Sequence, residues 1–428
     1  MVWPLAGRYI YTEEKFLVLF SAGNLHFDID STFHNIDFIK ETMKKTASVI
    51  LAFLAIVSAA CSYSMAAQAG SKIIIRVAIA DDRDSVSLSL RGRYKIYATG
   101  TDRVVMEGPF LTAKVTPAKD GLEIGSKPIK LFDVKVKVAR DSNIYVDGRR
   151  FRGDIDIIRK ENGKLMVINY IELDDYLYGV LYHEVSHRWP METLKAQAIA
   201  ARTFALYQAR QNKIQPYDVR SDIYSQVYGG RTSEKWSTTR AVNLTAGKIL
   251  TYNGDIFLSY YHATCAGYVE DASNLWNVDI SPLKGVPCNF CGHSPYYKWK
   301  KEIPLNSLES KLRDSGYKVS KIVSVTVLSK NESGRVDKIE IKDDAGVSVV
   351  LTGKDFRQIL GPNELRSTKF DASIKWANLI LAGNGWGHGV GMCQWGAFGM
   401  AKQRKKAEEI LKYYYPGAEI TTIDKVRQ

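Results

Sequence analysis

His183, Glu184 and His187 form a His-Glu-x-x-His pattern, in which a zinc protease would bind metal through both histidines and activate water with the glutamate. That chemistry requires the two histidines to lie one turn apart on a continuous helix. Pro190 follows His187 closely and cannot donate a hydrogen bond to the carbonyl of Ser186. We therefore expect the helix that carries Glu184 to fray near His187. A zinc protease is one alternative, but the pattern favours a glutamate that works without the two histidines.

A second group of residues with metal-binding chemistry lies further along the chain. His262-x-x-Cys265 is followed by Cys288-x-x-Cys291, which is the spacing of a zinc knuckle with three thiolates. We expect His262, Cys265, Cys288 and Cys291 to form a closed tetrahedral zinc site, with His293 as the rival for the fourth place. Such a site would be structural, because four protein ligands leave no position for water. Disulfide bonding among these cysteines is the alternative, and it is natural in an exported protein.

Charge narrows the class of partner. The 428 residues contain 59 Lys and Arg against 46 Asp and Glu, a formal net charge of +13. A basic protein favours an anionic partner such as nucleic acid, a membrane surface or a cell-wall polymer. The basic residues are spread along the chain, and no basic segment interleaved with aromatics is typical of nucleic-acid binding. We therefore expect no nucleic-acid partner.

The N-terminal segment indicates export. Met43-Lys44-Lys45 precedes a short apolar run, and Ala67-Gln68-Ala69 follows it. This order is typical of a secretory signal peptide over residues 43–69, because the apolar run is too short to span a bilayer. Cys61 lies in a sequence that resembles a lipoprotein cleavage box, so we expect at most a membrane anchor there. Residues 1–42 are unlike a targeting segment, and we interpret them as a non-native upstream extension. The predicted location is the periplasm or cell envelope.

The order of elements predicts an α+β protein. Residues 70–170 contain short alternating apolar segments bounded by Gly, Asp and Asn, which are typical of strands. They predict a β-rich N-terminal region. Residues 171–299 and 381–428 are expected to form a mixed α/β core. Residues 300–380 are expected to form a smaller α+β insertion within it.

Local signals place several elements. Residues 86–92 and 94–100 are predicted as separate strands, and residues 322–330 and 336–343 as two strands of the insertion. A helix should follow Glu172, and a second should start at Pro190, with Glu192 facing the positive end of its dipole. Asn253-Gly254 predicts the turn of a hairpin.

The segment 175–206 closely resembles the core of the stage II sporulation protein D and amidase enhancer family. The positions that match include Gly179, Val180, Glu184, Trp189, Pro190, Leu194, Lys195, Ala196, Gln197, Ala198, Ala201, Arg202 and Thr203. Further similar motifs follow in order at residues 225–230, 261–264, 333–336, 356–361, 365–370 and 385–401. The resemblance covers roughly residues 70–420, and several long motifs in one order make it specific. His183 and His187 fall on positions that the family pattern leaves free.

The resemblance implies an enzyme of the cell wall. Active members of this family are lytic transglycosylases, which break the bond between N-acetylmuramic acid and N-acetylglucosamine and leave a 1,6-anhydro end. It implies that Glu184 is the single catalytic acid and base, in what would then be the catalytic core. One carboxyl group can suffice because the sugar's own 6-hydroxyl attacks C1, whereas ordinary glycosidases use two carboxyl groups. We expect burial to raise the pKa of Glu184.

The resemblance also implies a substrate cleft and partners. Trp386 and Trp395 could stack on sugar rings, and His388 could hydrogen-bond a hydroxyl or orient the catalytic carboxyl. Gln226 and Tyr228 are further expected substrate contacts. The expected partner is the peptidoglycan glycan strand. The alternative is a non-catalytic member that binds peptidoglycan and activates a separate cell-wall amidase.

Overall fold

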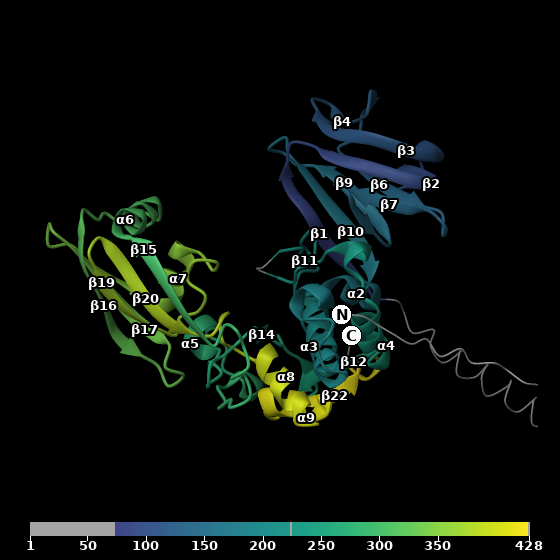
Figure 1. The fold of residues 1–428 in the computed structure, drawn as a ribbon. Helices are drawn as coiled ribbons and strands as arrows, with labels where there is room; N and C mark the ends of the chain where they lie inside the picture. Colours follow the sequence, from purple (N-terminus) through teal and green to yellow (C-terminus); the bar gives the residue numbers. More distant parts are fainter. Residues whose placement is uncertain (1–72, 223–224, 427–428) are drawn as a thin grey trace, which may run out of the picture. The chain divides into compact units, whose positions relative to one another are not determined.

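The computed structural model describes residues 73–222 and 225–426, whose elements are drawn in Figure 1. Helices and strands are both abundant, and the first part is built of strands alone, so the predicted α+β fold class is confirmed. The predicted extension 1–42, the signal peptide 43–69 and Cys61 lie outside the described residues. Within the described part, no helix combines the length and the apolar character needed to cross a membrane.

A twisted sheet forms the N-terminal part because its strands alternate apolar and polar residues. In β2, for example, Val86, Leu88 and Leu90 are buried, whereas Ser87 and Ser89 between them are more exposed. The strand order is β11-β1-β10-β9-β6-β2-β3-β4-β5, with β7 paired to β2 and β8 paired to β7. The strands are β1 (Ile74–Arg83), β2 (Val86–Ala98), β3 (Val104–Ala118), β4 (Gly121–Ile124), β5 (Lys127–Ile129), β6 (Asp133–Val138), β7 (Asn143–Val146), β8 (Arg149–Phe151), β9 (Asp154–Arg159), β10 (Leu165–Glu172) and β11 (Val219–Arg220).

One strand replaces the two predicted at residues 86–92 and 94–100. The register of β2 against β3 shifts near Gly92, which has a φ of +105°. A Cβ at this position would overlap Ser142. The glycine therefore marks a bulge that bends a continuous strand, where the sequence pattern had indicated a turn.

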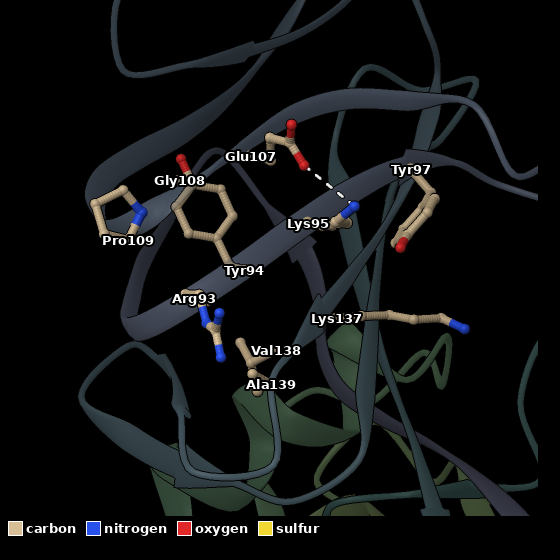
Figure 2. Close-up of a pocket in the computed structure, with 10 residues that line it drawn as sticks. All are labelled: Arg93, Tyr94, Lys95, Tyr97, Glu107, Gly108, Pro109, Lys137, Val138 and Ala139. Atoms are coloured by element: carbon tan, nitrogen blue, oxygen red, sulfur yellow. Dashed lines mark ion pairs between the residues drawn. The ribbon is translucent and has the colours of Figure 1, made fainter.

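The sheet carries a cavity of about 750 Å³ between residues of β2, β3 and β6 (Figure 2). One carboxylate lines it, that of Glu107, and its Oε2 pairs with Lys95 Nζ at 3.3 Å. The other charged side chains in its lining are Arg93 and Lys137. A cavity whose acid is already paired with a lysine is a poor place for proton transfer to a substrate.

Two helices on either side of Pro190 organise the core. Helix α2 (Leu173–Glu184) ends at Glu184, and α3 (Met191–Gln211) begins directly after Pro190, close to the predicted start. Arg202 of α3 is fully buried and donates to Asp174 of α2 at 2.8 Å and to the carbonyls of Val242 and Lys248. A buried arginine with these partners fixes α3 against its neighbours.

The remaining core elements are short. The predicted hairpin is confirmed, with positive φ at both Asn253 and Gly254 between its two antiparallel strands. The strands β14 and β21 pair in parallel, which brings residues 261–262 beside residues 392–393. The elements are η1 (Gly230–Ser233), α4 (Trp236–Leu244), β12 (Lys248–Tyr252), β13 (Asp255–Ile256), β14 (Tyr261–His262), α5 (Ser273–Trp276), η2 (Ser281–Leu283), β21 (Met392–Cys393), α8 (Gln394–Lys402), α9 (Ala407–Tyr414), β22 (Glu419–Thr422) and η3 (Ile423–Lys425).

The insertion has a hydrophobic core of its own and two three-stranded sheets, ordered β15-β20-β19 and β16-β17-β18. The strands predicted at residues 322–330 and 336–343 match β16 and β17. Leu308, Ile339, Phe356 and Leu379 are among the residues buried between its helices and sheets. Its elements are β15 (Lys298–Pro304), α6 (Leu305–Asp314), β16 (Ile322–Lys330), β17 (Val336–Asp343), β18 (Ser348–Thr352), α7 (Gly353–Leu360), β19 (Phe370–Lys375) and β20 (Asn378–Asn384).

Candidate active site

Glu184 is the last residue of α2, and the helix does not continue to His187. Val185 adopts extended angles, with φ −140° and ψ 151°. His183 Nε2 lies 2.7 Å from the Ser233 hydroxyl. In the described residues, His183, Glu184 and His187 do not gather as a set of metal ligands. The predicted fraying of the helix is confirmed, and the geometry argues against a zinc protease.

The Glu184 side chain lines a cavity of about 640 Å³. Aromatic side chains are prominent in its lining, among them Phe204, Tyr260, Tyr261, Trp276, Tyr296 and Trp386. Residues of the core form much of this cavity, and Arg357, Pro362 and Asn363 of the insertion also line it. Aromatic walls around a few polar groups are typical of a small-molecule or sugar site.

Burial raises the pKa of Glu184 from 4.5 to about 7, because the charged carboxylate is removed from water. Three hydrogen bonds oppose this rise. They come from the Gln394 amide, whose Nε2 lies 3.4 Å from Glu184 Oε2, from the Val227 backbone N–H and from the Tyr261 hydroxyl. The result is a carboxyl that can be protonated near neutral pH and still has donors ready for its anion.

Gln226 lies behind this site rather than in the cleft, so its expected contact with substrate is wrong. It is buried, its Nε2 donates to the Tyr261 hydroxyl at 2.8 Å, and its Oε1 accepts from the Tyr176 hydroxyl at 3.0 Å. Its neighbours Ser225 and Val227 line the cavity instead. Gln226 therefore holds Tyr261 in place beside the Glu184 carboxyl.

Tyr228 is also a core residue and not a substrate contact. Its hydroxyl donates to Asn169 Oδ1 at 2.9 Å, and its ring packs 5.1 Å from that of Tyr176. Its ring lies so close to Gly179 of α2 that a Cβ at that glycine would overlap it. The tyrosine fixes α2, which carries Glu184, against the N-terminal sheet.

Trp386 and His388 both line the Glu184 cavity, as expected. The ring of Trp386 stands edge-on to Tyr296 at 4.4 Å. Both nitrogens of His388 contact the backbone, since Nε2 lies 3.0 Å from the Tyr261 carbonyl and Nδ1 accepts from the Val390 N–H at 3.1 Å. Burial holds its pKa well below the usual value, so the ring is neutral. His388 thus positions the backbone of Tyr261, and no hydrogen bond joins its ring to the Glu184 carboxyl in the described structure.

Trp395, the second tryptophan expected to stack on sugar, lies elsewhere. It packs against Trp189 at 4.9 Å and Phe398 at 5.3 Å, and it is not part of the cavity lining. Tyr261 and Gln394 hydrogen-bond Glu184 and line the cavity, but the sequence did not single them out. Each lies inside a motif that the family resemblance had marked, but a motif does not tell which of its side chains face the cleft.

The cysteines do converge, with a different fourth member. The Sγ atoms of Cys265, Cys288, Cys291 and Cys393 all lie within 4.8 Å of one another, and all four thiols are buried and free. His262, the expected fourth ligand, is not in this group, and its Nδ1 contacts the Val390 carbonyl at 3.0 Å. Cys393 takes the place expected for His262 because β14 pairs in parallel with β21, which brings Cys393 next to the segment that carries His262 and Cys265.

His293, the rival for the fourth ligand position, is exposed and lies outside the group.

The four sulfurs fit one metal ion. A tetrahedral ion with zinc–sulfur bonds of about 2.3 Å holds its sulfurs about 3.8 Å apart. The Cys265 and Cys291 sulfurs are 3.6 Å apart here.

Comparison with known proteins agrees with the motifs. A family model described as stage II sporulation protein matches residues 161–252. Stage II sporulation protein D of Bacillus subtilis is 31% identical over 272 residues, which are 60% of this chain and 76% of that protein. The chain belongs to the stage II sporulation protein D family. The resemblance inferred from the sequence is thereby confirmed.

Other similar proteins extend the comparison. The amidase enhancer of Bacillus subtilis is 26% identical over 293 residues, which are 58% of this chain and 40% of that protein. An uncharacterized protein of Brachyspira hyodysenteriae is 32% identical over 357 residues, 83% of this chain and 95% of that protein. A domain of unknown function matches residues 289–391, which include the insertion.

Proposed function

We propose that this protein is an exported peptidoglycan lytic transglycosylase that cleaves the bond between N-acetylmuramic acid and N-acetylglucosamine. The observation that carries the proposal is Glu184, a carboxyl with a pKa of about 7 in an aromatic-lined cavity. Membership of the family supports a role related to the cell wall and is consistent with an enzyme that degrades it.

A single carboxyl can complete the proposed reaction. Glu184 donates its proton to the glycosidic oxygen as the bond from C1 to that oxygen breaks. The donors on Tyr261, Gln394 and the Val227 N–H stabilise the carboxylate that results. The carboxylate then accepts the proton of the 6-hydroxyl while that oxygen bonds to C1. The product is a 1,6-anhydro sugar, and no water is consumed.

A second carboxyl in the cavity lining defines the main chemical competitor. Asp222 also lines the cavity, and its Oδ2 pairs with Arg220 Nε at 2.8 Å. A hydrolase would use one carboxyl as acid and another to activate water. In the proposed reaction Asp222 has no such task, so the two mechanisms differ in their dependence on it.

A non-catalytic role is the second candidate, favoured by the similarity to the amidase enhancer. In that role the cavity would bind glycan and the protein would activate a separate cell-wall amidase. That role requires only that the cavity binds glycan, and the raised pKa of Glu184 would have no function in it.

We also propose that Cys265, Cys288, Cys291 and Cys393 bind one zinc ion. Four buried sulfurs at these distances are typical of a closed structural site. The ion would stabilise the core beside the cavity and would take no part in proton transfer.

The test is glycan release from purified sacculi by the protein without any amidase. We expect Glu184→Gln to abolish release while Asp222→Asn, the matched carboxyl-to-amide control, retains most of it. Loss in both variants would indicate a two-carboxyl hydrolase. Absence of release by the unmodified protein, together with stimulation of an added amidase, would support the second candidate instead.

A further inference from the structure

We propose that Arg335, assisted by Lys369, supplies the positive charge that balances a four-thiolate metal site at Cys265, Cys288, Cys291 and Cys393. This inference rests on the proposed zinc site and goes beyond the enzymatic function. Both cations belong to the insertion, whereas all four cysteines lie outside its strands and helices. Metal binding would therefore also hold the insertion to the core.

The protein neighbours of Arg335 do not satisfy all the hydrogen-bond donors of its buried guanidinium. Its side chain is only 1% exposed, yet Nε and Nη1 have no hydrogen-bond partner in the described structure. Nη2 reaches the Cys265 carbonyl at a long 3.4 Å. A buried guanidinium with unpaired donors is costly unless a further acceptor satisfies it.

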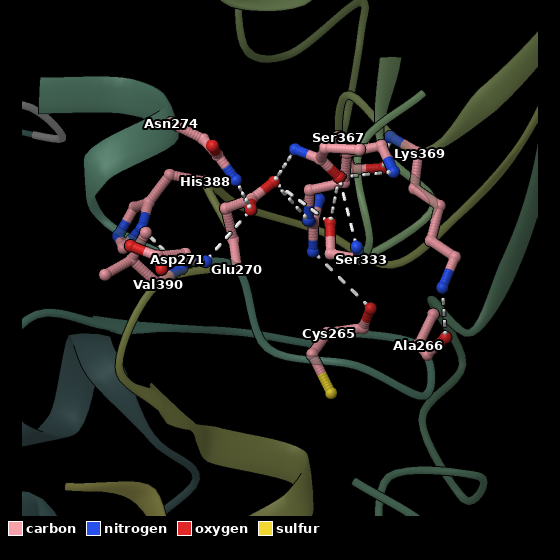
Figure 3. A network of polar contacts seen from close by, with 12 residues as sticks. Cys265, Ala266, Glu270, Asp271, Asn274, Ser333, Ser367, Lys369, His388 and Val390 are labelled. Carbon is pink, nitrogen blue, oxygen red and sulfur yellow. Dashed lines mark hydrogen bonds and ion pairs between the residues drawn. The ribbon is translucent and has the colours of Figure 1, made fainter. Parts of the chain in front are cut away.

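Glu270 is the nearby carboxylate, and it is largely satisfied by other donors. It accepts from Asn274 Nδ2 at 2.8 Å, from Asn331 Nδ2 at 2.7 Å and from the Ser333 hydroxyl at 3.0 Å (Figure 3). Its distance from Arg335 Nε is 3.8 Å, too long for a hydrogen bond. Glu270 thus balances the charge of Arg335 in part and leaves its donors unpaired.

The guanidinium also lies beside the backbone of Cys265, through the contact of Nη2 with its carbonyl. It is packed against Gly389, where any Cβ would overlap it, and negative charge on Cys265 or Cys393 would raise its pKa against the lowering effect of burial. Lys369 is partly buried, and its Nζ donates to the Ala266 carbonyl at 3.0 Å. Negative charge on Cys265 or Cys291 would raise its pKa, whereas burial lowers it. Figure 3 shows Cys265, Ala266, Ser333 and Lys369 within one network.

The charge of a loaded site explains this arrangement. Metal binds the thiolate and not the thiol, so one divalent ion with four cysteines carries two net negative charges. Those charges are expensive to bury alone. The two cations oppose these two negative charges.

The test measures zinc affinity of the full chain by competition with a chromophoric chelator. We expect Arg335→Met to weaken zinc binding by about 10- to 100-fold, the usual effect of losing a partner of the ligands. Lys338→Met is the matched control, since it removes the same charge from an exposed site on the adjacent strand β17, and we expect it to leave affinity unchanged.

Circular dichroism establishes whether each variant folds. If Arg335→Met does not fold, Lys369→Met decides the question, with an expected loss of several-fold and an unchanged affinity as the contradicting result. Unchanged affinity in a folded Arg335→Met variant would overturn the inference even if Cys393→Ser shows that the zinc site exists. None of these outcomes depends on glycan release, so they leave the test of the enzymatic proposal separate.

Discussion

Replacement of Glu184 by glutamine should make the protein more stable at alkaline pH, because the site is built for a protonated carboxyl. Burial raises the pKa of Glu184 from 4.5 to about 7 in the folded state. Between these values the folded chain keeps a proton that the unfolded chain releases, so the folded state loses stability as the pH rises. This loss of folding stability is complete above pH 7. Glutamine has no proton to release, so the Glu184→Gln variant does not lose stability in this way.

The size of the effect follows from the pKa. The rise from 4.5 to about 7 corresponds to about 3 kcal/mol, and partial exposure to the cavity lowers this to about 1–3 kcal/mol. The difference in unfolding free energy between Glu184→Gln and the unmodified protein should therefore grow by this amount between pH 4 and pH 8.

The assay is urea unfolding followed by tryptophan fluorescence at a series of pH values. Glu302→Gln serves as the control, since the Glu302 side chain is 57% exposed and pairs with a surface lysine, Lys300, at 3.1 Å. Its difference from the unmodified protein should stay nearly constant with pH. A difference for Glu184→Gln that is equally flat would refute the claim that this carboxyl is held protonated.

Three further changes test neighbouring parts of the site. Tyr261→Phe removes a donor to the Glu184 carboxylate, so the pKa of Glu184 should rise. The alkaline limb of kcat/KM, measured on soluble glycan strands, should then move up by about one pH unit. Trp386→Ala should raise KM about fivefold with a smaller effect on kcat, because a stacking contact of about 1 kcal/mol is lost, and an unchanged KM would exclude the contact. In metal analysis, Cys393→Ser should lower the amount of bound zinc, whereas His262→Ala should not. Loss of zinc in His262→Ala but not in Cys393→Ser would show that His262 is the fourth ligand, as the sequence spacing predicted.

Local signals predicted the elements that position Glu184. Pro190 predicted that the helix carrying Glu184 would fray near His187, and α2 ends three residues earlier, at Glu184. Pro190 also marked the start of α3, because proline suits a helix start. Alternation of apolar residues likewise located β16 and β17. These signals succeed because they depend on a few neighbouring residues.

Contacts between distant segments were the part that the sequence could not predict. Gln226 and Tyr228 belong to a matched motif, but whether they face the cleft depends on packing against Tyr176 and Tyr261. The fourth cysteine was missed for the same reason. The spacing rule favoured a residue near Cys265, whereas Cys393 arrives through the pairing of two strands far apart in the chain.

The most direct test of the proposed lytic reaction is the chemical identity of the new glycan ends that the protein leaves on sacculi. The account predicts that mass spectrometry will find new muramic acid ends in the 1,6-anhydro form, lighter by one water than a hydrolysed end, and that Glu184→Gln will produce none. New reducing ends, or anhydro ends released undiminished by Glu184→Gln, would contradict a proton transfer centred on Glu184.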